Sequence, residues 1–206
     1  MILKVLAMYN SADKVVAYLI ALYIERFGRL KAEPMLTEAE VFAKVNQLYA
    51  DLLEQIYVYF IVIASGAYEN AGGAKGVIDR QWLETNVLSV YDPVTKYVFL
   101  NEVDRKRSRL IESLIASDDK AKEIDTALKY WSAMITQYAI TTVDTATLTA
   151  YKHQGVSEVV WVSFKDKKRC VVCKERDGKV YPIDDIPPKP HIGCRCYFVP
   201  KGRSDK

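Results

Sequence analysis

The chain has 206 residues, of which 50% are hydrophobic and 27% are charged. A chain of this length buries a sizeable core without disulfides or metals, and this composition excludes a disordered tail and a fibrous repeat. The formal net charge of +3 is too small to mark the whole molecule as a nucleic-acid binder, but residues 157–206 carry a net charge of +5 and residues 1–156 carry −2.

Apolar residues at helical spacing predict two helices in the first third of the chain. The first is expected to start at Ser11, and Gly28 and Pro34 are expected to stop its pattern. Thr37 and Glu40 form a capping-box pattern, which predicts the start of a long second helix. The longest uninterrupted apolar run, residues 56–64, is about half of the roughly 20 residues that a membrane-spanning helix requires. We therefore expect this run to be a buried helix, with no membrane partner.

Glycines and an Asp-Pro pair divide the middle of the chain. Four glycines within residues 66–76 raise the entropic cost of a helix, which predicts a loop or hairpin there. The Asp-Pro pair at residues 92–93 is typical of a helix start, and this helix is expected to run to about Ala116. Asp119 closes a Ser-Asp-Asp sequence that predicts the cap of a further helix, ending near Gly155.

Beyond Gly155 the apolar period changes from helical spacing to alternation. Residues 158–164 are rich in β-branched and aromatic side chains, which predicts a strand. Residues 179–181 and 196–199 are two shorter strand candidates.

All four cysteines, Cys170, Cys173, Cys194 and Cys196, lie in the last 37 residues. A C-x-x-C pair followed by a second close pair is typical of a structural zinc site, because two thiolates on one turn reach a metal about 2.3 Å away and the second pair completes a tetrahedron. His191 is the reserve ligand. Two disulfides, unpaired buried thiols and metal-free turns remain alternatives. The N-terminal sequence has no basic leader, so we expect a reducing cytoplasm, which disfavours disulfides.

These patterns together predict a mainly α fold with a small C-terminal β-rich zinc-knuckle module, an α+β architecture. Residues 1–155 are expected to form an elongated helical body, and residues 156–206 the cysteine-containing module. A module of about 50 residues has a small core of its own, so a structural metal there makes physical sense.

From Trp161 onward, the sequence resembles the C-terminal domain of the Mu F-like minor head, or head morphogenesis, proteins of tailed bacteriophages. The shared pattern is an aromatic strand, a basic-acidic link, C-x-x-C, a D-G turn, a proline-rich loop, and a histidine closely followed by C-R-C and a proline. It is carried here by Trp161, Asp166, Cys170, Cys173, Asp177, Gly178, Pro187, Pro188, Pro190, His191, Cys194, Arg195, Cys196 and Pro200.

The resemblance implies a low-copy virion protein that is assembled in the host cytoplasm and has no established catalytic centre. It also implies association with the portal protein during head assembly. We expect the chain to dock on the portal and on the adjoining shell of major capsid protein. Packaged DNA is a further candidate partner.

Two sets of basic residues are candidate contacts with DNA phosphates or with an acidic partner surface. Arg105 and Arg109 share a face of the predicted 93–116 helix, although a solvated face with ion pairs explains them as well. The second set surrounds the proposed metal site, and its charges are explained equally well by attraction to DNA phosphates and by a role in solubility. Its members are Lys167, Lys168, Arg169 and Arg195.

An enzyme would need a general base, and the chain offers only His153 and His191. His153 falls in a predicted last helical turn, where a polar or positive residue suits the free carbonyl groups. A nuclease centre at His191 would need a metal with an open coordination position, whereas four thiolates close the shell. We therefore expect no enzyme activity. The alternative function is a stand-alone zinc-stabilised DNA-binding or nuclease module.

Overall fold

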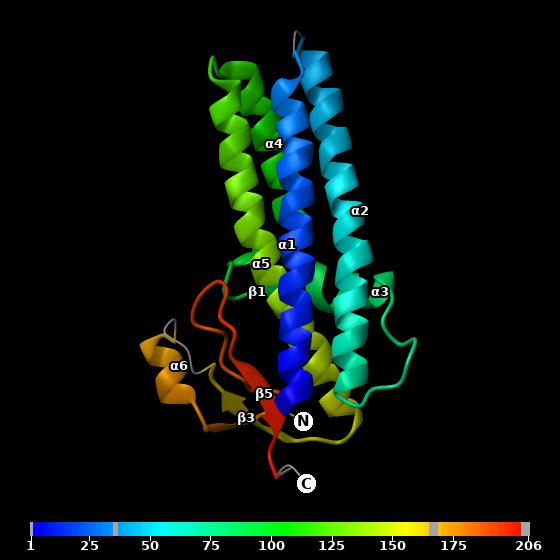
Figure 1. Cartoon of the computed structure of the whole chain (residues 1–206), viewed down its shortest axis with the longest axis vertical. Helices are drawn as coiled ribbons and strands as arrows, with labels where there is room; N and C mark the ends of the chain where they lie inside the picture. The colour runs from blue at the N-terminus through cyan, green and yellow to red at the C-terminus, as the bar shows by residue number, and fades with distance from the viewer. Residues whose placement is uncertain (1, 35–36, 165–168, 203–206) are drawn as a thin grey trace.

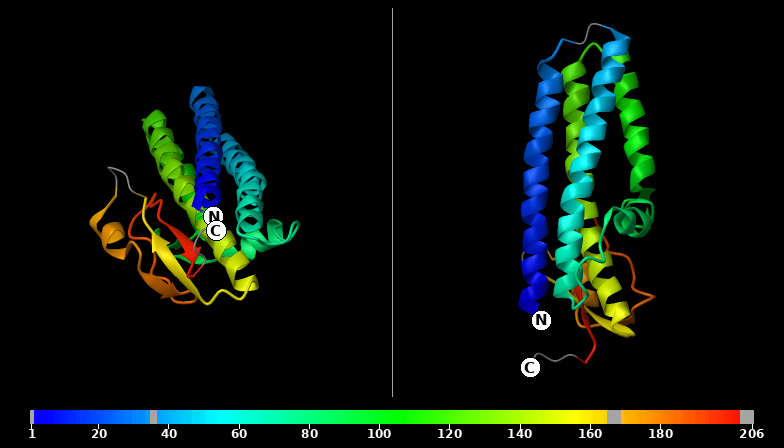
Figure 2. Two further views of the ribbon diagram at one scale, coloured as in Figure 1. Left: turned by 60° about the horizontal axis from the view of Figure 1, so that its bottom comes forward. Right: turned by 90° about the vertical axis from the view of Figure 1, so that its right-hand side faces the viewer.

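Four long helices lie side by side and form most of the molecule (Figure 1). The computed structural model describes residues 2–34, 37–164 and 169–202, with side chains from Tyr9 onward. The chain runs up, down, up and down through the four helices (Figures 1 and 2). They are α1 (Ile2–Ala32), α2 (Glu38–Asn70), α4 (Phe99–Ala116) and α5 (Lys120–His153).

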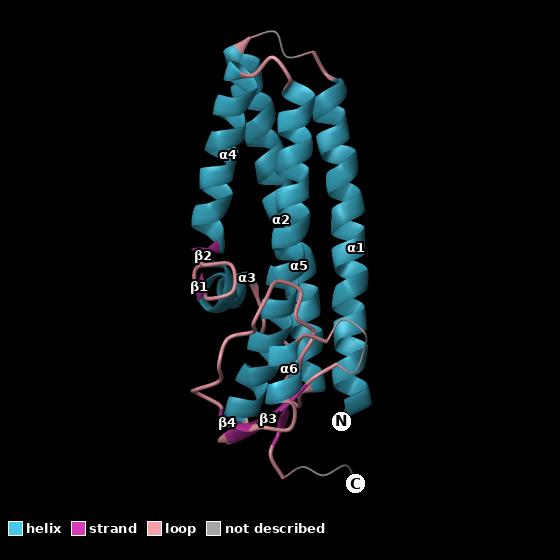
Figure 3. Cartoon of the chain, turned by 90° about the vertical axis from the view of Figure 1, so that its left-hand side faces the viewer, coloured by secondary structure: helices cyan, strands magenta, loops and turns pink. Residues whose placement is uncertain are grey.

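One helix of the bundle is much shorter than the others. α4 has 18 residues and is about 27 Å long, whereas α5 has 34 residues and is about 51 Å long. α4 therefore covers only the upper part of α5. The lower part of α5 packs against the C-terminal segment, near the N-terminal end of α1 (Figures 1 and 3).

α1 begins at Ile2, so the predicted start at Ser11 is wrong. Residues 2–10 contain neither glycine nor proline, and the helix continues through them so that Ser11 lies in its interior. α1 passes through Gly28 and ends at Ala32, so of the two predicted stops Pro34 is the one that lies just beyond the helix end. A single glycine costs a helix about 1 kcal/mol, and burial of the neighbouring Phe27 and Leu30 offsets that cost.

The capping box at the start of α2 is confirmed. The Thr37 hydroxyl accepts from the Glu40 backbone N–H at 3.2 Å, and the Glu40 carboxylate accepts from the Thr37 N–H at 2.9 Å. α2 passes through Gly66 and ends at Asn70, so the predicted loop begins later than expected. By length and composition alone, α2 could cross a membrane, and 44% of its most apolar window is buried in the bundle.

Gly73 stands where the chain leaves α2 and passes close to the ring of Tyr68. A Cβ at Gly73 would lie 2.1 Å from Cε1 of Tyr68, and the Tyr68 hydroxyl is hydrogen-bonded to Nδ1 of His153 at 2.6 Å. We expect Gly73→Ala to lower the free energy of unfolding by about 1–3 kcal/mol, because the ring must move and strain this contact. Urea unfolding followed by circular dichroism measures the change.

Gly66→Ala is the matched control, since Gly66 lies inside α2 and an added Cβ there meets no described atom within 4 Å. We expect this variant to gain about 0.5–1 kcal/mol from the lower entropy cost of alanine in a helix. Equal effects of the two substitutions would show that the Tyr68 contact does not constrain Gly73.

The segment after α2 differs most from the expectation. It forms a short helix α3 (Arg80–Leu83), a π-helical turn (Glu84–Leu88) and a hairpin of β1 (Tyr91–Asp92) and β2 (Tyr97–Val98). The helix predicted from residues 92–93 is wrong at its start, because Asp92 accepts from the N–H groups of Val94 and Thr95 inside the hairpin. α4 instead starts at Phe99, and it ends at Ala116 as predicted.

The last long helix follows the prediction closely. Asp119 caps α5 by accepting from the Lys122 N–H at 3.0 Å, and α5 ends at His153, two residues before Gly155. Gly155 has a φ of +72°, a conformation that favours glycine after a helix end.

The C-terminal segment folds into a three-stranded antiparallel sheet and a short helix. The sheet order is β4-β3-β5, so β3 is central, with Trp161 opposite Phe198. Val159 and Trp161 point into the core while their neighbours are partly exposed, which confirms the predicted alternation. The mainly α fold with a small β-rich C-terminal part is therefore confirmed. Its elements are β3 (Glu158–Val162), α6 (Val171–Arg176), β4 (Val180–Pro182) and β5 (Tyr197–Pro200).

Candidate metal centre

The first cysteine pair stands at the start of α6. Cys170 is the N-cap residue, and its Sγ accepts a hydrogen bond from the Cys173 backbone N–H at 3.3 Å. The Cys170 carbonyl accepts from the Lys174 N–H at 3.0 Å, which closes the first helical turn. Because the turn folds around one sulfur, both thiols of the pair face the same space.

Asp177 and Gly178 hold this helix against the central strand. The Asp177 carboxylate accepts from the Ser163 N–H at 2.8 Å and pairs with Arg169 at 2.8 Å. Gly178 has a φ of +77°, and its N–H donates to the Trp161 carbonyl at 2.8 Å. Asp177 and Gly178 therefore connect the end of α6 to the strand β3, and Asp177 also contacts Arg169, the residue before the first cysteine.

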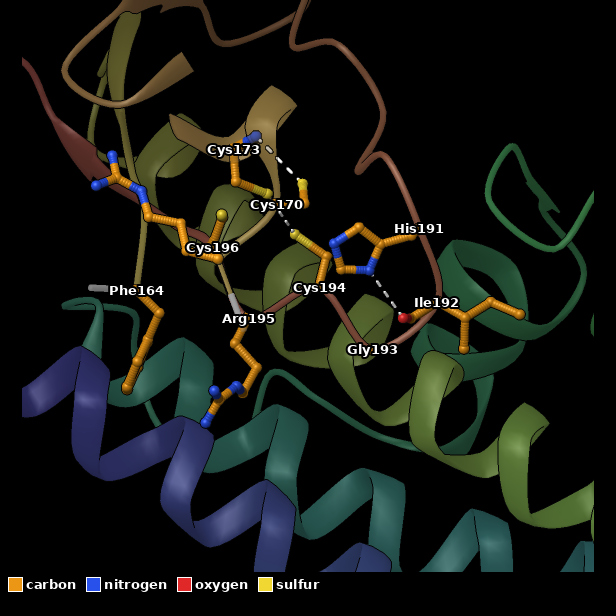
Figure 4. Close-up of a pocket in the computed structure, with 10 residues that line it drawn as sticks. Phe164, Cys170, Cys173, His191, Ile192, Gly193, Cys194, Arg195 and Cys196 are labelled. Atoms are coloured by element: carbon orange, nitrogen blue, oxygen red, sulfur yellow. Dashed lines mark hydrogen bonds between the residues drawn. The ribbon is translucent and has the colours of Figure 1, made fainter. Parts of the chain in front are cut away.

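The second pair lies in the segment that leads into β5. Cys194 and Cys196 are both buried, and the Cys194 N–H donates to the His191 carbonyl at 3.3 Å across a tight turn. Gly193 takes a φ of +75° in this turn, a conformation open to glycine. Figure 4 shows the thiols of this pair facing Cys173, with His191 beside them.

The donor atoms gather into two groups that share Cys173. Cys173, Cys194 and Cys196 place their sulfurs within 4.8 Å of one another, and so do the donor atoms of Cys170, Cys173 and His191. The sulfurs of Cys173 and Cys194 are 3.5 Å apart. A tetrahedral zinc site with bonds of 2.3 Å has sulfur–sulfur edges of about 3.8 Å, so this spacing suits shared coordination.

The four cysteines are free thiols. The 3.5 Å separation of Cys173 and Cys194 is well beyond the bond length of about 2.05 Å in a disulfide. The cluster can hold a metal ion, and a set of four thiols with one imidazole is the donor chemistry that zinc prefers.

The thiols differ in their tendency to ionise. Burial raises the pKa of Cys173 to about 12, and the hydrogen bond with Cys196 raises the pKa of Cys194 further. The same hydrogen bond, donated by Cys194, lowers the pKa of Cys196 to about 5. One negative charge is thus favoured in the buried group, while further charges repel one another. A bound divalent cation would remove that repulsion.

Trp161 supplies a donor next to this group. Its indole Nε1–H is buried and has no hydrogen-bond partner by distance and angle among the described residues. The same N–H lies close enough to Cys196 to lower the pKa of that thiol. A thiolate ligand at Cys196 would give this buried N–H an acceptor, so the surroundings fit a charged sulfur better than a neutral one.

The basic residues predicted around the cluster are partly committed to other contacts. Arg169 pairs with Asp177, and the Arg195 guanidinium stacks 4.7 Å from the ring centre of Phe164. Both arginines line a cavity of about 210 Å³ beside the cysteines. Lys167 and Lys168, like Asp166, lie outside the described residues.

Arg105 and Arg109 lie on α4, away from the cysteines. Arg105 binds both oxygens of the buried Glu102 at 2.6 Å and stacks on Tyr97, so its charge is already compensated. Arg109 is exposed and faces a cavity between α4 and α5. Arg109 thus faces a different cavity from the one that Arg169 and Arg195 line.

Sequence reasoning missed the residues that connect the cysteine loop to the helices. Gln137 on α5 accepts from the Gly193 N–H at 3.1 Å, and Asp144 on α5 pairs with Lys189 at 2.5 Å. In the sequence, Gln137 and Asp144 are polar residues within an apolar stretch of α5. This indicates that they need buried partners, but it does not identify those partners.

Residues 108–199 match the family model described as phage Mu protein F like protein. The match covers a little under half of the chain and includes part of α4, all of α5 and the segment that holds the four cysteines. No curated protein and no solved structure matches the chain significantly. The family implies a structural role in phage head morphogenesis and a place in the virion, which suggests a role without catalysis.

The matched range contains the residues on which the sequence resemblance rests, from Trp161 through Cys196. Residues 108–199 are therefore similar to the phage Mu protein F like family, which confirms the resemblance expected from the sequence.

Proposed function

We propose that this chain is a minor head protein that binds one structural zinc ion and docks on the portal protein and the adjoining major capsid protein. Cys170, Cys173, Cys194 and Cys196 are the proposed ligands, with His191 as the reserve ligand. The protein has no catalytic role in this proposal. Assembly takes place in the host cytoplasm, before the protein becomes part of the virion.

The observation that carries the proposal is the meeting of two distant cysteine pairs in one cluster, in which Cys173, Cys194 and Cys196 are buried. Cys173 comes from α6, whereas Cys194 and Cys196 come from the segment before β5, and their sulfurs lie within 4.8 Å of one another. Zinc bound there supplies bonds between these two segments. The closed donor set is typical of structural rather than catalytic zinc.

The small size of the sheet beside the cysteines supports the proposal of a structural metal. β3, β4 and β5 have 5, 3 and 4 residues, and strands this short contribute little stability of their own. The segment between β4 and β5 has no regular secondary structure. A metal bonded to both cysteine pairs would fix this segment and give the outer surface a defined shape.

The tip of α6 is the docking surface that the proposal favours. Val171 is 72% exposed and Val172 is also exposed, next to the exposed Lys174. Apolar side chains beside positive charge suit a partner surface that is apolar and acidic. DNA contact is the weaker part of the proposal, because Arg105 and Arg169 are already paired with carboxylates.

Co-expression with the portal protein of the same phage, followed by metal analysis of the purified complex, tests the proposal. We expect about one zinc per chain and stable co-purification for the wild type. Cys173→Ser should lose both the zinc and the portal, whereas Val171→Asp should keep the zinc and lose the portal. Val180→Ser is the control, since Val180 is exposed on β4 and is not a proposed ligand.

Reduced protein without stoichiometric zinc would contradict the metal assignment. Full portal binding by Val171→Asp would contradict the docking surface. Metal-dependent cleavage of DNA that is lost in His191→Ala would instead support the alternative function, a zinc-stabilised nuclease module.

A further inference from the structure

The loop that carries the second cysteine pair is fixed from outside by a helix of the bundle. The buried side chain of Gln137, on α5, accepts from the Gly193 N–H at 3.1 Å, one residue before Cys194. The Gln137 amide also donates to the Thr141 hydroxyl at 3.2 Å, so its orientation is set by its own helix. The turn that aims Cys194 is therefore attached to a rigid element 56 residues earlier in the chain.

A second attachment lies on the other side of the same loop. Lys189 is 6% exposed and pairs with Asp144 of α5 at 2.5 Å. Tyr9, on α1, donates its hydroxyl hydrogen bond to the same carboxylate and lies 3.5 Å from the Cys196 carbonyl oxygen. The Lys189 ammonium also lies 5.3 Å from the ring centre of Tyr9. α1 and α5 thus hold the backbone on both sides of the C-x-C pair.

These contacts matter because the loop has only isolated turns, and no helix or strand, to set its conformation. The residues between β4 and β5 form turns and irregular structure, and the first cysteine pair lies on α6, across the cluster (Figure 4). If two cysteine ligands lie on a flexible loop, metal binding must order that loop, and the lost conformational entropy lowers the affinity. If the cysteines are already held in position, this cost is not part of metal binding.

We propose that Gln137, Asp144 and Lys189 are positioning residues for the cation site, and that Tyr9 links occupation of the site to the packing of α1. The inference rests on the proposed metal site and goes beyond it, because it places determinants of metal affinity in the helical bundle. By linkage, a contact that strengthens metal binding must itself be strengthened by the metal.

Zinc affinity measured by competition with a chromophoric chelator tests the first part. Gln137→Met leaves the Gly193 N–H without its acceptor, and we expect affinity to fall about 10- to 100-fold, the range found when groups behind metal ligands are removed. Thr142→Val is the matched control: Thr142 is also buried on α5, and its hydroxyl donates to the Tyr138 carbonyl of the same helix. It should lose stability without losing zinc affinity.

Gln137→Glu supplies a rescue in its protonated form. One oxygen keeps the acceptor for the Gly193 N–H, and the carboxyl O–H replaces the amide as donor to the Thr141 oxygen, because the Thr141 proton is donated to Asp92. We expect an affinity close to that of the wild type. Equal affinity of Gln137→Met and the wild type would overturn the positioning role, and so would equal losses in Gln137→Met and Thr142→Val. Failure of the wild type to bind zinc at all would instead overturn the proposed metal function.

Amide hydrogen exchange tests the link to α1. Added zinc should slow exchange in the α1 peptide around Tyr9 of the wild type, and the effect should be clearly smaller in Tyr9→Phe, which lacks the hydroxyl. Tyr23→Phe is the control, since Tyr23 lies on the same helix and its hydroxyl bonds the Leu52 carbonyl of α2. Zinc-independent exchange around Tyr9 in the wild type would overturn the link.

Discussion

Cys173→Ser is expected to release the zinc and to unfold the C-terminal sheet while the helical bundle remains folded. Cys173 is the residue that both donor groups share, so its loss breaks the connection between α6 and the loop before β5. Structural zinc in small domains contributes up to about 10–16 kcal/mol, which sets the upper limit of the effect. The bundle keeps its own large core of α1, α2, α4 and α5 side chains.

Hydrogen exchange followed by mass spectrometry measures this result region by region. Peptides from residues 158–200 should exchange much faster in Cys173→Ser, and peptides from α2 should be nearly unchanged. A chelator added to the reduced wild type should reproduce the pattern without any substitution. Equal protection of residues 158–200 with and without zinc would contradict the prediction.

Val159→Ala separates metal loss from loss of packing. Val159 is fully buried on β3 and offers no ligand, so the variant creates a cavity and leaves all four sulfurs in place. We expect about 1 kcal/mol or more of destabilisation, with full zinc content retained. Loss of zinc in this variant would mean that the sheet, rather than the ligand set, determines metal binding.

The parts of the fold that could be predicted are those decided by neighbours in sequence. Thr37 and Glu40 bond each other's backbone three residues apart, so their pattern identifies a helix start without any knowledge of the rest. The cysteine cluster is similar, because the spacing within each pair already limits the geometry of the turn. The alternation around Trp161 likewise follows from burial of one face of β3.

The missed features depend on distant partners. An Asp-Pro sequence suits both a helix start and a turn, and at Asp92 the choice is made by α5, because the Thr141 hydroxyl bonds its carboxylate at 2.9 Å and Tyr138 contacts Thr95. Gln137 and Gly193 are 56 residues apart, and neither has a local pattern that points to the other. The gathering of the four cysteines could therefore be predicted from sequence, whereas the residues of α1 and α5 that contact their loop could not.

Asp144→Asn is expected to destabilise the whole protein by about 3–5 kcal/mol, because it leaves the buried Lys189 ammonium without its counter-charge. Both side chains are largely removed from water, with exposed fractions of 14% for Asp144 and 6% for Lys189. Burial raises the pKa of Asp144 even though Lys189 and Tyr9 act to lower it, so the charge is held there against a desolvation cost. Urea unfolding of the zinc-loaded protein measures the effect.

The double variant Asp144→Asn, Lys189→Met distinguishes an ion pair from a simple packing contact. Removing both charges leaves no unpaired ion, and the Tyr9 hydroxyl can still donate to the asparagine oxygen, so we expect most of the lost stability to return. The double variant should therefore be much more stable than the sum of the two single-variant effects predicts, which gives a large coupling energy between Asp144 and Lys189. Additive losses in the double variant would show that Asp144 and Lys189 stabilise the junction independently. In that case the loop would be held to α5 by packing alone, and zinc affinity should then be insensitive to the charge at residue 144.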